Sequence, residues 1–202
     1  MTWLLGLVGL LYPLLLVLGL LEFEPRVMAI AVGVLTLLRW WTWGKGKTAI
    51  PTAAILAAFL CALGFTAIAA VLNDEVYLRL LPVLVNVVLL AVALASLVGG
   101  RPIVESLARL QVDSLSSAEV RYCRSVTWVW SAFFVLNGGT IAWLAIEGER
   151  EAWALYTGFV SYLLIGALFV VEYVYRHYRF RRYLGAPTDA LLRRWFPPDS
   201  VG

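Results

Sequence analysis

Histidine, cysteine and charged residues are scarce in this chain of 202 residues. One histidine, two cysteines and 14% charged residues are present, whereas soluble domains usually carry about a quarter charged residues. Cys61, Cys123 and His177 are too few and too far apart in sequence to form a structural zinc site. The sequence also lacks a nucleophile elbow, a phosphate-binding loop and a zinc-protease motif. These absences exclude an ordinary water-soluble domain, and they predict no catalytic residue, metal site or cofactor.

Apolar residues dominate instead. They make up 62% of the chain, and the mean hydropathy is +0.85. Runs of about 20 apolar residues cross roughly 30 Å of hydrocarbon, where a helix satisfies its own backbone. Six such runs cover 3–21, 27–43, 49–72, 80–98, 126–146 and 152–175. The sequence therefore predicts an all-α polytopic membrane protein, with a six-helix transmembrane domain at 1–178 and a basic cytoplasmic tail with a short amphipathic, interfacial helix at 179–202.

The basic residues are divided unevenly between the predicted loops. With six crossings, thirteen of the 16 lie on one side: Arg39, Lys45, Lys47, Arg101, Arg109, Arg121, Arg124, Arg176, Arg179, Arg181, Arg182, Arg193 and Arg194. The other side keeps Arg26, Arg79 and Arg150 among many acids. Because short cytoplasmic loops are enriched in lysine and arginine, we expect a multi-pass protein of the bacterial inner membrane with both termini in the cytoplasm. The placement of the basic residues argues against a nucleic-acid partner.

Tryptophans cluster near the ends of the predicted crossings. Trp128 begins the fifth, while Trp143 and Trp153 flank the turn between the fifth and the sixth. Amphipathic rings settle at the level of the lipid headgroups. We therefore expect these side chains to form interfacial belts rather than a ligand-stacking cluster.

The longest loop, 99–125, has an internal pattern of its own. Ile103, Leu107 and Leu110 repeat at helical spacing, between polar residues at Arg101, Glu105 and Arg109. This pattern predicts an amphipathic helix on the cytoplasmic interface. Ser116 and Glu119 have the spacing of a capping box, which would open the fifth helix early. Arg121 and Arg124 would then lie on a cytoplasmic extension, as candidates for binding lipid headgroups or a partner protein.

Two asparagines interrupt the apolar runs. Asn86 lies in the fourth run, and Asn137 lies near the middle of the fifth, just before Gly138. Polar side chains in hydrocarbon are costly and are often functional. They either join two helices through a hydrogen bond or line a polar pocket between the fourth and fifth helices.

The last apolar run ends in the stretch EYVYRHYRFRRY, residues 172–183. Its candidate headgroup-binding or partner-binding residues are Glu172, Arg176, His177, Arg179, Arg181 and Arg182. Glu172 and Arg176 have the spacing of a helical ion pair, whereas Glu172 and His177 point about 140° apart on a helix. The pattern favours an anchor that grips anionic headgroups over a catalytic pair.

Three stretches carry a resemblance to a known family. They are Leu72-Asn73-Asp74-Glu75-Val76, the segment GRPIVE at 100–105, and the helix with Trp128, Trp130, Phe133, Phe134 and Gly138. Over roughly residues 11–178 the chain resembles the YciB, or intracellular septation protein A, family of bacterial inner-membrane proteins. It is also similar to a sister group encoded beside aryl polyene biosynthesis genes. The first resemblance implies a role in envelope integrity, and the second implies work near acyl-chain assembly; neither supplies a catalytic residue.

These observations favour a non-enzymatic membrane protein that supports the biogenesis of the cell envelope or of membrane lipids, among which aryl polyene lipids are one candidate. Its expected partners are membrane lipids and other envelope or lipid-synthesis proteins, and the oligomeric state is left open. Two alternatives are a transporter of lipids or small molecules with a polar cavity at Asn86 and Asn137, and a membrane enzyme acting on an acyl or polyprenyl substrate through Glu172, Arg176 or His177.

Overall fold

The computed structural model describes residues 23–41, 52–110, 112, 114–181, 183, 188 and 193–197. The first predicted crossing, 3–21, and the candidate residue Arg182 lie outside this set. The chain divides into two compact units, Met1–Ser161 (unit 1) and Tyr162–Gly202 (unit 2). Each unit is described by itself. The boundary between the units differs from the division predicted at residue 178. The prediction was based on where the apolar runs end, whereas the two units are defined by how the chain packs.

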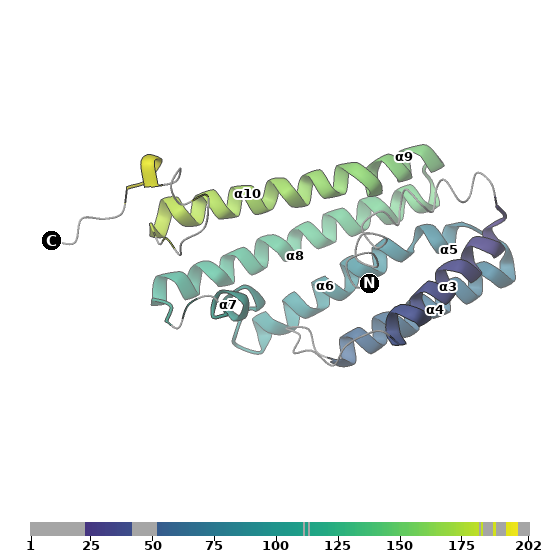
Figure 1. Cartoon of the computed structure of the whole chain (residues 1–202), viewed down its shortest axis with the longest axis horizontal. Coiled ribbons are helices and arrows are strands. Elements are labelled where there is room, and N and C mark those ends of the chain that lie inside the picture. Colours follow the sequence, from purple (N-terminus) through teal and green to yellow (C-terminus); the bar gives the residue numbers. More distant parts are fainter. Residues whose placement is uncertain are drawn as a thin grey trace. The chain divides into compact units, whose positions relative to one another are not determined.

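All the secondary structure in the described residues is helical, and Figure 1 shows its order. Unit 1 contains α3 (Pro25–Trp41), α4 (Thr52–Leu72), α5 (Val76–Arg79), α6 (Leu81–Val98), α7 (Ile103–Ala108), α8 (Ser117–Ile146), α9 (Arg150–Leu155) and the π-helical turn η1 (Tyr156–Val160). Helix α10 (Ser161–Phe180) continues into unit 2. Within unit 1, α4 lies between α3 and α6, and α8 packs against α6 and α7.

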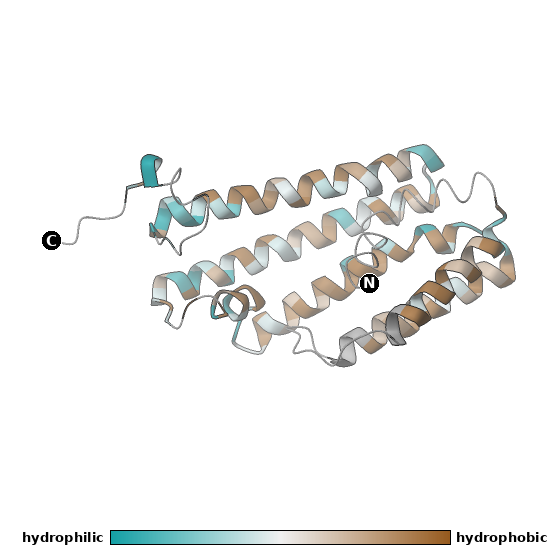
Figure 2. Cartoon of the chain, in the orientation of Figure 1, coloured by the Kyte–Doolittle hydropathy of each residue, from teal (hydrophilic) through white to brown (hydrophobic). Residues whose placement is uncertain are grey.

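In the part of the chain that the structure describes, three helices are long and apolar enough to cross a membrane: Val76–Val98, Ser117–Ile146 and the continuous helix Arg150–Phe180. Helices α3 and α4 occupy the second and third predicted crossings, but their apolar stretches, Pro25–Leu38 and Leu56–Leu72, are shorter. Figure 2 shows apolar residues along most of α3, α4 and α6, with hydrophilic residues gathered at the start of α9 and the end of α10. The chain is therefore an all-helical protein with the helices of a membrane protein.

The early start of α8 is confirmed. Ser116 caps the helix by accepting a hydrogen bond from the Glu119 backbone N–H, and the Glu119 carboxylate accepts from the Ser116 N–H at 2.7 Å. The capping box satisfies two backbone donors that the first turn would leave without a partner. Helix α8 has 30 residues and is about 45 Å long. It is thus longer than the hydrocarbon layer, and its first turns extend beyond the apolar run.

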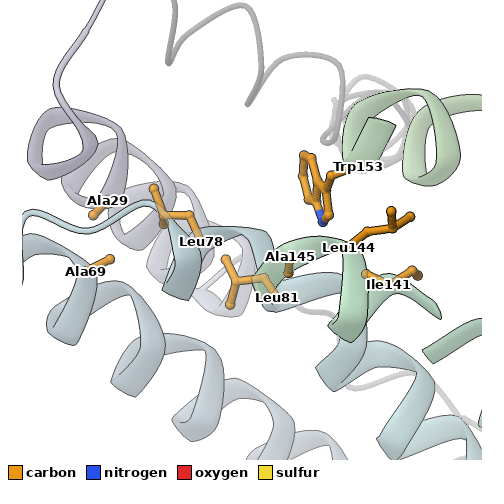
Figure 3. Close-up of a cluster of buried hydrophobic side chains, with 8 residues drawn as sticks. All are labelled: Ala29, Ala69, Leu78, Leu81, Ile141, Leu144, Ala145 and Trp153. Carbon is orange, nitrogen blue, oxygen red and sulfur yellow. The ribbon is translucent and has the colours of Figure 1, made fainter. Parts of the chain in front are cut away.

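A small apolar core joins the helices of unit 1 at one end. It contains Ala29, Ala69, Leu78, Leu81, Ile141, Leu144, Ala145 and Trp153 (Figure 3). The expectation that Trp153 belongs to an interfacial belt is wrong, because its side chain is fully buried and its indole N–H donates to the Arg79 carbonyl at 3.1 Å. Trp128 and Trp143 are 54% and 62% exposed, as a belt requires.

The α3–α4 hairpin is closed by the residues around Asn73. Asn73 has the left-handed φ of 53°, which asparagine tolerates better than most residues. Its side-chain oxygen accepts from the Arg26 backbone N–H at 2.9 Å, at the start of α3. The Arg26 Nε donates to the Ala70 carbonyl at 2.9 Å, near the end of α4. These two bonds satisfy backbone groups at both helix ends and fix the hairpin.

We predict that Gly148→Ala destabilises the fold, because a Cβ at residue 148 would lie 2.7 Å from the Leu144 carbonyl oxygen and 2.9 Å from the Leu144 Cα. Backbone atoms must move to make room, which costs about 1–3 kcal/mol. The matched control is Gly139→Ala in α8, where a Cβ meets nothing within 4 Å. Thermal unfolding in detergent should show a loss only for the first variant; equal midpoints would contradict this packing.

Candidate functional site

Asn86 and Asn137 meet in the interior of unit 1. The Asn137 side-chain N–H donates to the Asn86 side-chain oxygen at 3.1 Å, and the Asn86 side-chain N–H donates to the Pro82 carbonyl at 2.9 Å. The Asn137 oxygen accepts from the Tyr156 hydroxyl at 3.1 Å and from the Ser161 hydroxyl at 2.8 Å. Both asparagines and Ser161 are less than a tenth exposed. We call these four side chains the amide network.

The π-helical turn explains how Tyr156 and Ser161 reach the same acceptor. On an α-helix, residues five apart point about 140° away from each other. Here the Ser161 backbone N–H bonds to the Tyr156 carbonyl, five residues earlier. This wider turn brings the two hydroxyls onto one face. π-helical turns of this kind frequently occur at functional positions.

The bonds described for the amide network all end within the protein. Both lone pairs of the Asn137 side-chain oxygen are used, and each amide donates one hydrogen bond within the protein. A Cβ at residue 138 would lie 3.0 Å from the Asn86 Cβ, so glycine allows the close approach of α6 and α8. This geometry favours the first interpretation of the two asparagines, in which they join helices.

A second polar cluster lies where the α3–α4 hairpin, α5 and α9 meet. The Glu75 carboxylate binds Arg79 Nη2 at 2.9 Å and Arg150 Nη2 at 2.6 Å. Arg79 Nη1 donates to the Gly148 carbonyl at 3.3 Å. Residues 24–26, 73–79 and 147–153 are called the Glu75 end of unit 1.

The Glu75 end is acidic at its surface. Arg26, Arg79 and Arg150 all bond to carbonyl or carboxylate oxygens within unit 1. The acids there that remain exposed are Glu24, Asp74, Glu147, Glu149 and Glu151. Arg26, Arg79 and Arg150, the three basic residues on the predicted outer side, therefore make structural bonds within unit 1.

The opposite end of unit 1, residues 96–125, is called the Arg101 end. Arg101, Arg109, Arg121 and Arg124 are all exposed. Two of these also have structural bonds: Arg109 Nε pairs with the Glu105 carboxylate at 2.8 Å, and Arg124 Nη2 donates to the Leu97 carbonyl at 3.3 Å near the end of α6. No such bond is described for Arg101 or Arg121 within the residues that the structure covers. These two side chains are the best placed to bind a ligand.

Helix α7 differs from the predicted amphipathic arrangement. Glu105, expected on the polar side, is only 5% exposed, whereas Leu107 and Leu110 are 47% and 79% exposed. Helix α7 packs against α8, and the Ile103 N–H donates to the Ser96 hydroxyl at 2.9 Å. The buried carboxylate is retained because Arg109, one turn later, neutralises it. The leucines thus lie on the surface beside the arginines.

In unit 2, the predicted Glu172–Arg176 pair is present with Nε and Oε1 3.6 Å apart. His177 is 6% exposed, and its Nδ1 lies 2.8 Å from the Tyr173 carbonyl. Arg179 is exposed and Arg181 partly exposed. Among the described residues, no group of three histidine, cysteine, aspartate or glutamate side chains could hold a metal ion.

Sequence reasoning did not identify Tyr156 and Ser161, because no regular helical spacing links residues five apart. It placed Arg79 and Arg150 only as exceptions to the charge distribution. The pairing of Glu75 with Arg79, four residues later and acid first, was visible as a helical ion-pair spacing. Nothing in the sequence indicated that Arg150 would join it.

Comparison of the chain with protein-family models, with curated proteins and with solved structures gives no significant match.

We predict that Asn137→Ala destabilises unit 1 by about 1–2 kcal/mol, because the part-buried hydroxyl of Tyr156 and the buried hydroxyl of Ser161 lose their acceptor. Unfolding in mixed micelles measures the loss. Thr140→Ala is the control, since its hydroxyl bonds only to the Leu136 carbonyl of its own helix. A double-mutant cycle with Asn86→Ala should give a coupling energy of about 0.5–1.5 kcal/mol; additive effects would contradict a direct bond.

Proposed function

We propose that the chain is a non-enzymatic protein of the bacterial inner membrane with six transmembrane helices and both termini in the cytoplasm. It supports cell-envelope or membrane-lipid biogenesis by binding lipids or partner proteins through the Arg101 end. The resemblance to the YciB family and to the group encoded beside aryl polyene genes suggests the same setting. Lys45, Lys47 and Arg182, which would add to the cytoplasmic charge, lie outside the described residues.

The observation that carries this proposal is the charge difference between the two ends of unit 1. The Glu75 end exposes five acids and bonds its arginines internally. The Arg101 end exposes four arginines. Cytoplasmic loops are enriched in arginine, and the cytoplasmic leaflet carries anionic lipids. The two ends therefore suit the outer and inner surfaces of the membrane, respectively.

Exposed apolar side chains at the Arg101 end support lipid as the ligand. Val98, Leu107 and Leu110 are 90%, 47% and 79% exposed. In water, such side chains would be costly next to four cations. At a bilayer surface they enter the acyl layer while the guanidinium groups stay among the phosphates. Binding to a soluble acidic protein would use the arginines and leave the leucines in water.

The transporter alternative is less well supported. It needs a polar cavity at Asn86 and Asn137, and the bonds of those amides end within the protein. The enzyme alternative depends on Glu172, Arg176 and His177. In the structure the first two form an ion pair, and the third bonds to a backbone carbonyl. Both arrangements are those of structural residues.

We predict that replacing Arg101 and Arg121 together by glutamine weakens the binding of phosphatidylglycerol by about thirtyfold, because each arginine near an anionic surface contributes about a factor of five. Titration of the purified chain in neutral detergent, followed by native mass spectrometry, measures this. The Arg101→Lys, Arg121→Lys double variant keeps the charge and should bind nearly as well as the wild type. Unchanged binding by the glutamine variant would contradict the proposed function.

A further inference from the structure

The chain turns back on itself directly after α10. Arg181 has a φ of 47°, and its backbone N–H bonds to the His177 carbonyl at 3.0 Å. For a residue with a side chain, the left-handed conformation costs roughly 1–2 kcal/mol. Contacts that form after the turn must offset this cost. Tyr183 and Thr188, two described residues after the turn, both contact α10.

Those contacts form a row of stacked side chains within unit 2. The His177 ring lies 4.3 Å from the Tyr173 ring and 5.6 Å from the Tyr183 ring, measured between centroids. The Arg193 guanidinium lies over the Tyr183 ring, 5.0 Å from its centroid. The row thus links the last two turns of α10 to the C-terminal segment.

Further contacts hold the same segment. The Tyr183 hydroxyl donates to the Phe196 carbonyl, and the Phe196 ring packs edge-on against Tyr178 at 5.5 Å. Tyr173 and Thr188 share a hydrogen bond through their hydroxyls. Tyr183, Thr188 and Phe196 therefore contact α10 between Tyr173 and Tyr178. We call residues 173–181, 183 and 193–196 the tail clamp.

The tail clamp lies where the last helix leaves the hydrocarbon. The helix Arg150–Phe180 has 31 residues and is about 46 Å long, against roughly 30 Å of hydrocarbon. Charged residues begin at Glu172, near the end of the apolar run 152–175. The last two turns therefore lie among the headgroups, and the segment folded against them lies at the same depth.

The exposed groups of the tail clamp are arginines and aromatic rings. Arg179, Arg193 and Arg194 are exposed, and Tyr175, Tyr178 and Trp195 are 49%, 55% and 66% exposed. The described acid in this region, Glu172, is paired with Arg176. Cations suit phosphate, and amphipathic rings suit the boundary between headgroups and acyl chains. A soluble anion would use the arginines but not the rings.

We propose that the tail clamp is a second lipid site, in which Arg179, Arg193 and Arg194 bind the phosphate of an anionic phospholipid while Trp195 enters the interface. This inference deepens the proposed function, on which it rests for the membrane location. The stacking of Tyr183 between His177 and Arg193 positions the arginines; it makes no contact with the lipid.

The test is phosphatidylglycerol binding to the full chain in neutral detergent, measured by native mass spectrometry with Arg101 and Arg121 intact. Native mass spectrometry resolves how many lipids are bound, so the two sites are measured separately. Arg193→Gln with Arg194→Gln should weaken binding at one site about thirtyfold, since two arginines are lost, and leave binding at the other site unchanged. Tyr183→Ala should weaken binding at the same site as the glutamine variant, at least several-fold although no charge changes, because the segment is released. Tyr183→Phe keeps the stacked ring but loses the hydroxyl bond to the Phe196 carbonyl, so it should weaken binding less than Tyr183→Ala does. The double lysine variant of Arg193 and Arg194 keeps the charge and should bind nearly as well as the wild type.

Unchanged binding in the glutamine variant would overturn the site. Loss in that variant with normal binding in Tyr183→Ala would overturn the role of the folded segment, because arginines in a free tail would suffice. Displacement of the lipid by an equal concentration of inorganic phosphate would overturn the assignment to a lipid. Loss of binding confined to the Arg101 and Arg121 variants would support the proposed function and rule out the tail clamp as a lipid site. Loss of binding confined to the tail variants would support the tail clamp site and contradict lipid binding at the Arg101 end.

Discussion

The fold of unit 1 depends on how charged side chains are paired at the Glu75 end. One carboxylate binds Arg79 and Arg150, and Arg79 also bonds to the Gly148 carbonyl that follows α8. In lipid, apolar side chains gain little by leaving the acyl chains for one another, so polar contacts and close packing decide which helices associate. A partly buried carboxylate with two cations is a specific contact of this kind, because removing the carboxylate leaves two arginines without their ionic partner. It fixes α5, and hence α6, relative to α8 and α9.

The amide network has the same role deeper in unit 1. It connects α6, α8 and the π-helical turn after α9 through four side chains whose bonds end within the protein. The hairpin of α3 and α4 is closed by Asn73 and Arg26. Because the arginines of the Glu75 end are used in these joints, its exposed charge is mainly negative, with Arg26 the exposed cation among five exposed acids. Four exposed arginines among the described residues of unit 1 lie at the Arg101 end. Pairing that stabilises the helices therefore also separates the surface charge, on which the proposed lipid binding depends.

The sequence predicted much of the helical architecture and less of the contacts. The hydrophobic runs predicted the bounds of α6 and the end of α8, and the spacing of Ser116 and Glu119 predicted the capping box that begins α8. These signals could be read because they are local in the sequence. Asn86 and Asn137 stood out because amides are costly in hydrocarbon. Tyr156 and Ser161 could not be found, since a π-helical turn breaks the periodicity that pattern reading assumes. The burial of Trp153 and Glu105 was missed because it depends on neighbours distant in the sequence. The Arg79 carbonyl accepts from the indole of Trp153, and the helix that carries Glu105, α7, packs against α8.

The central claim is that the Glu75 end and the Arg101 end face opposite sides of the membrane, with the acidic end outside. Single cysteines at Glu149 and at Ser117, both exposed positions, in a background without Cys61 and Cys123, test it directly. An impermeant maleimide added to intact spheroplasts should label Glu149→Cys at once and Ser117→Cys only after the membrane is permeabilised. Labelling in the reverse order would invert the orientation, and labelling of both positions in intact spheroplasts would contradict the charge argument altogether.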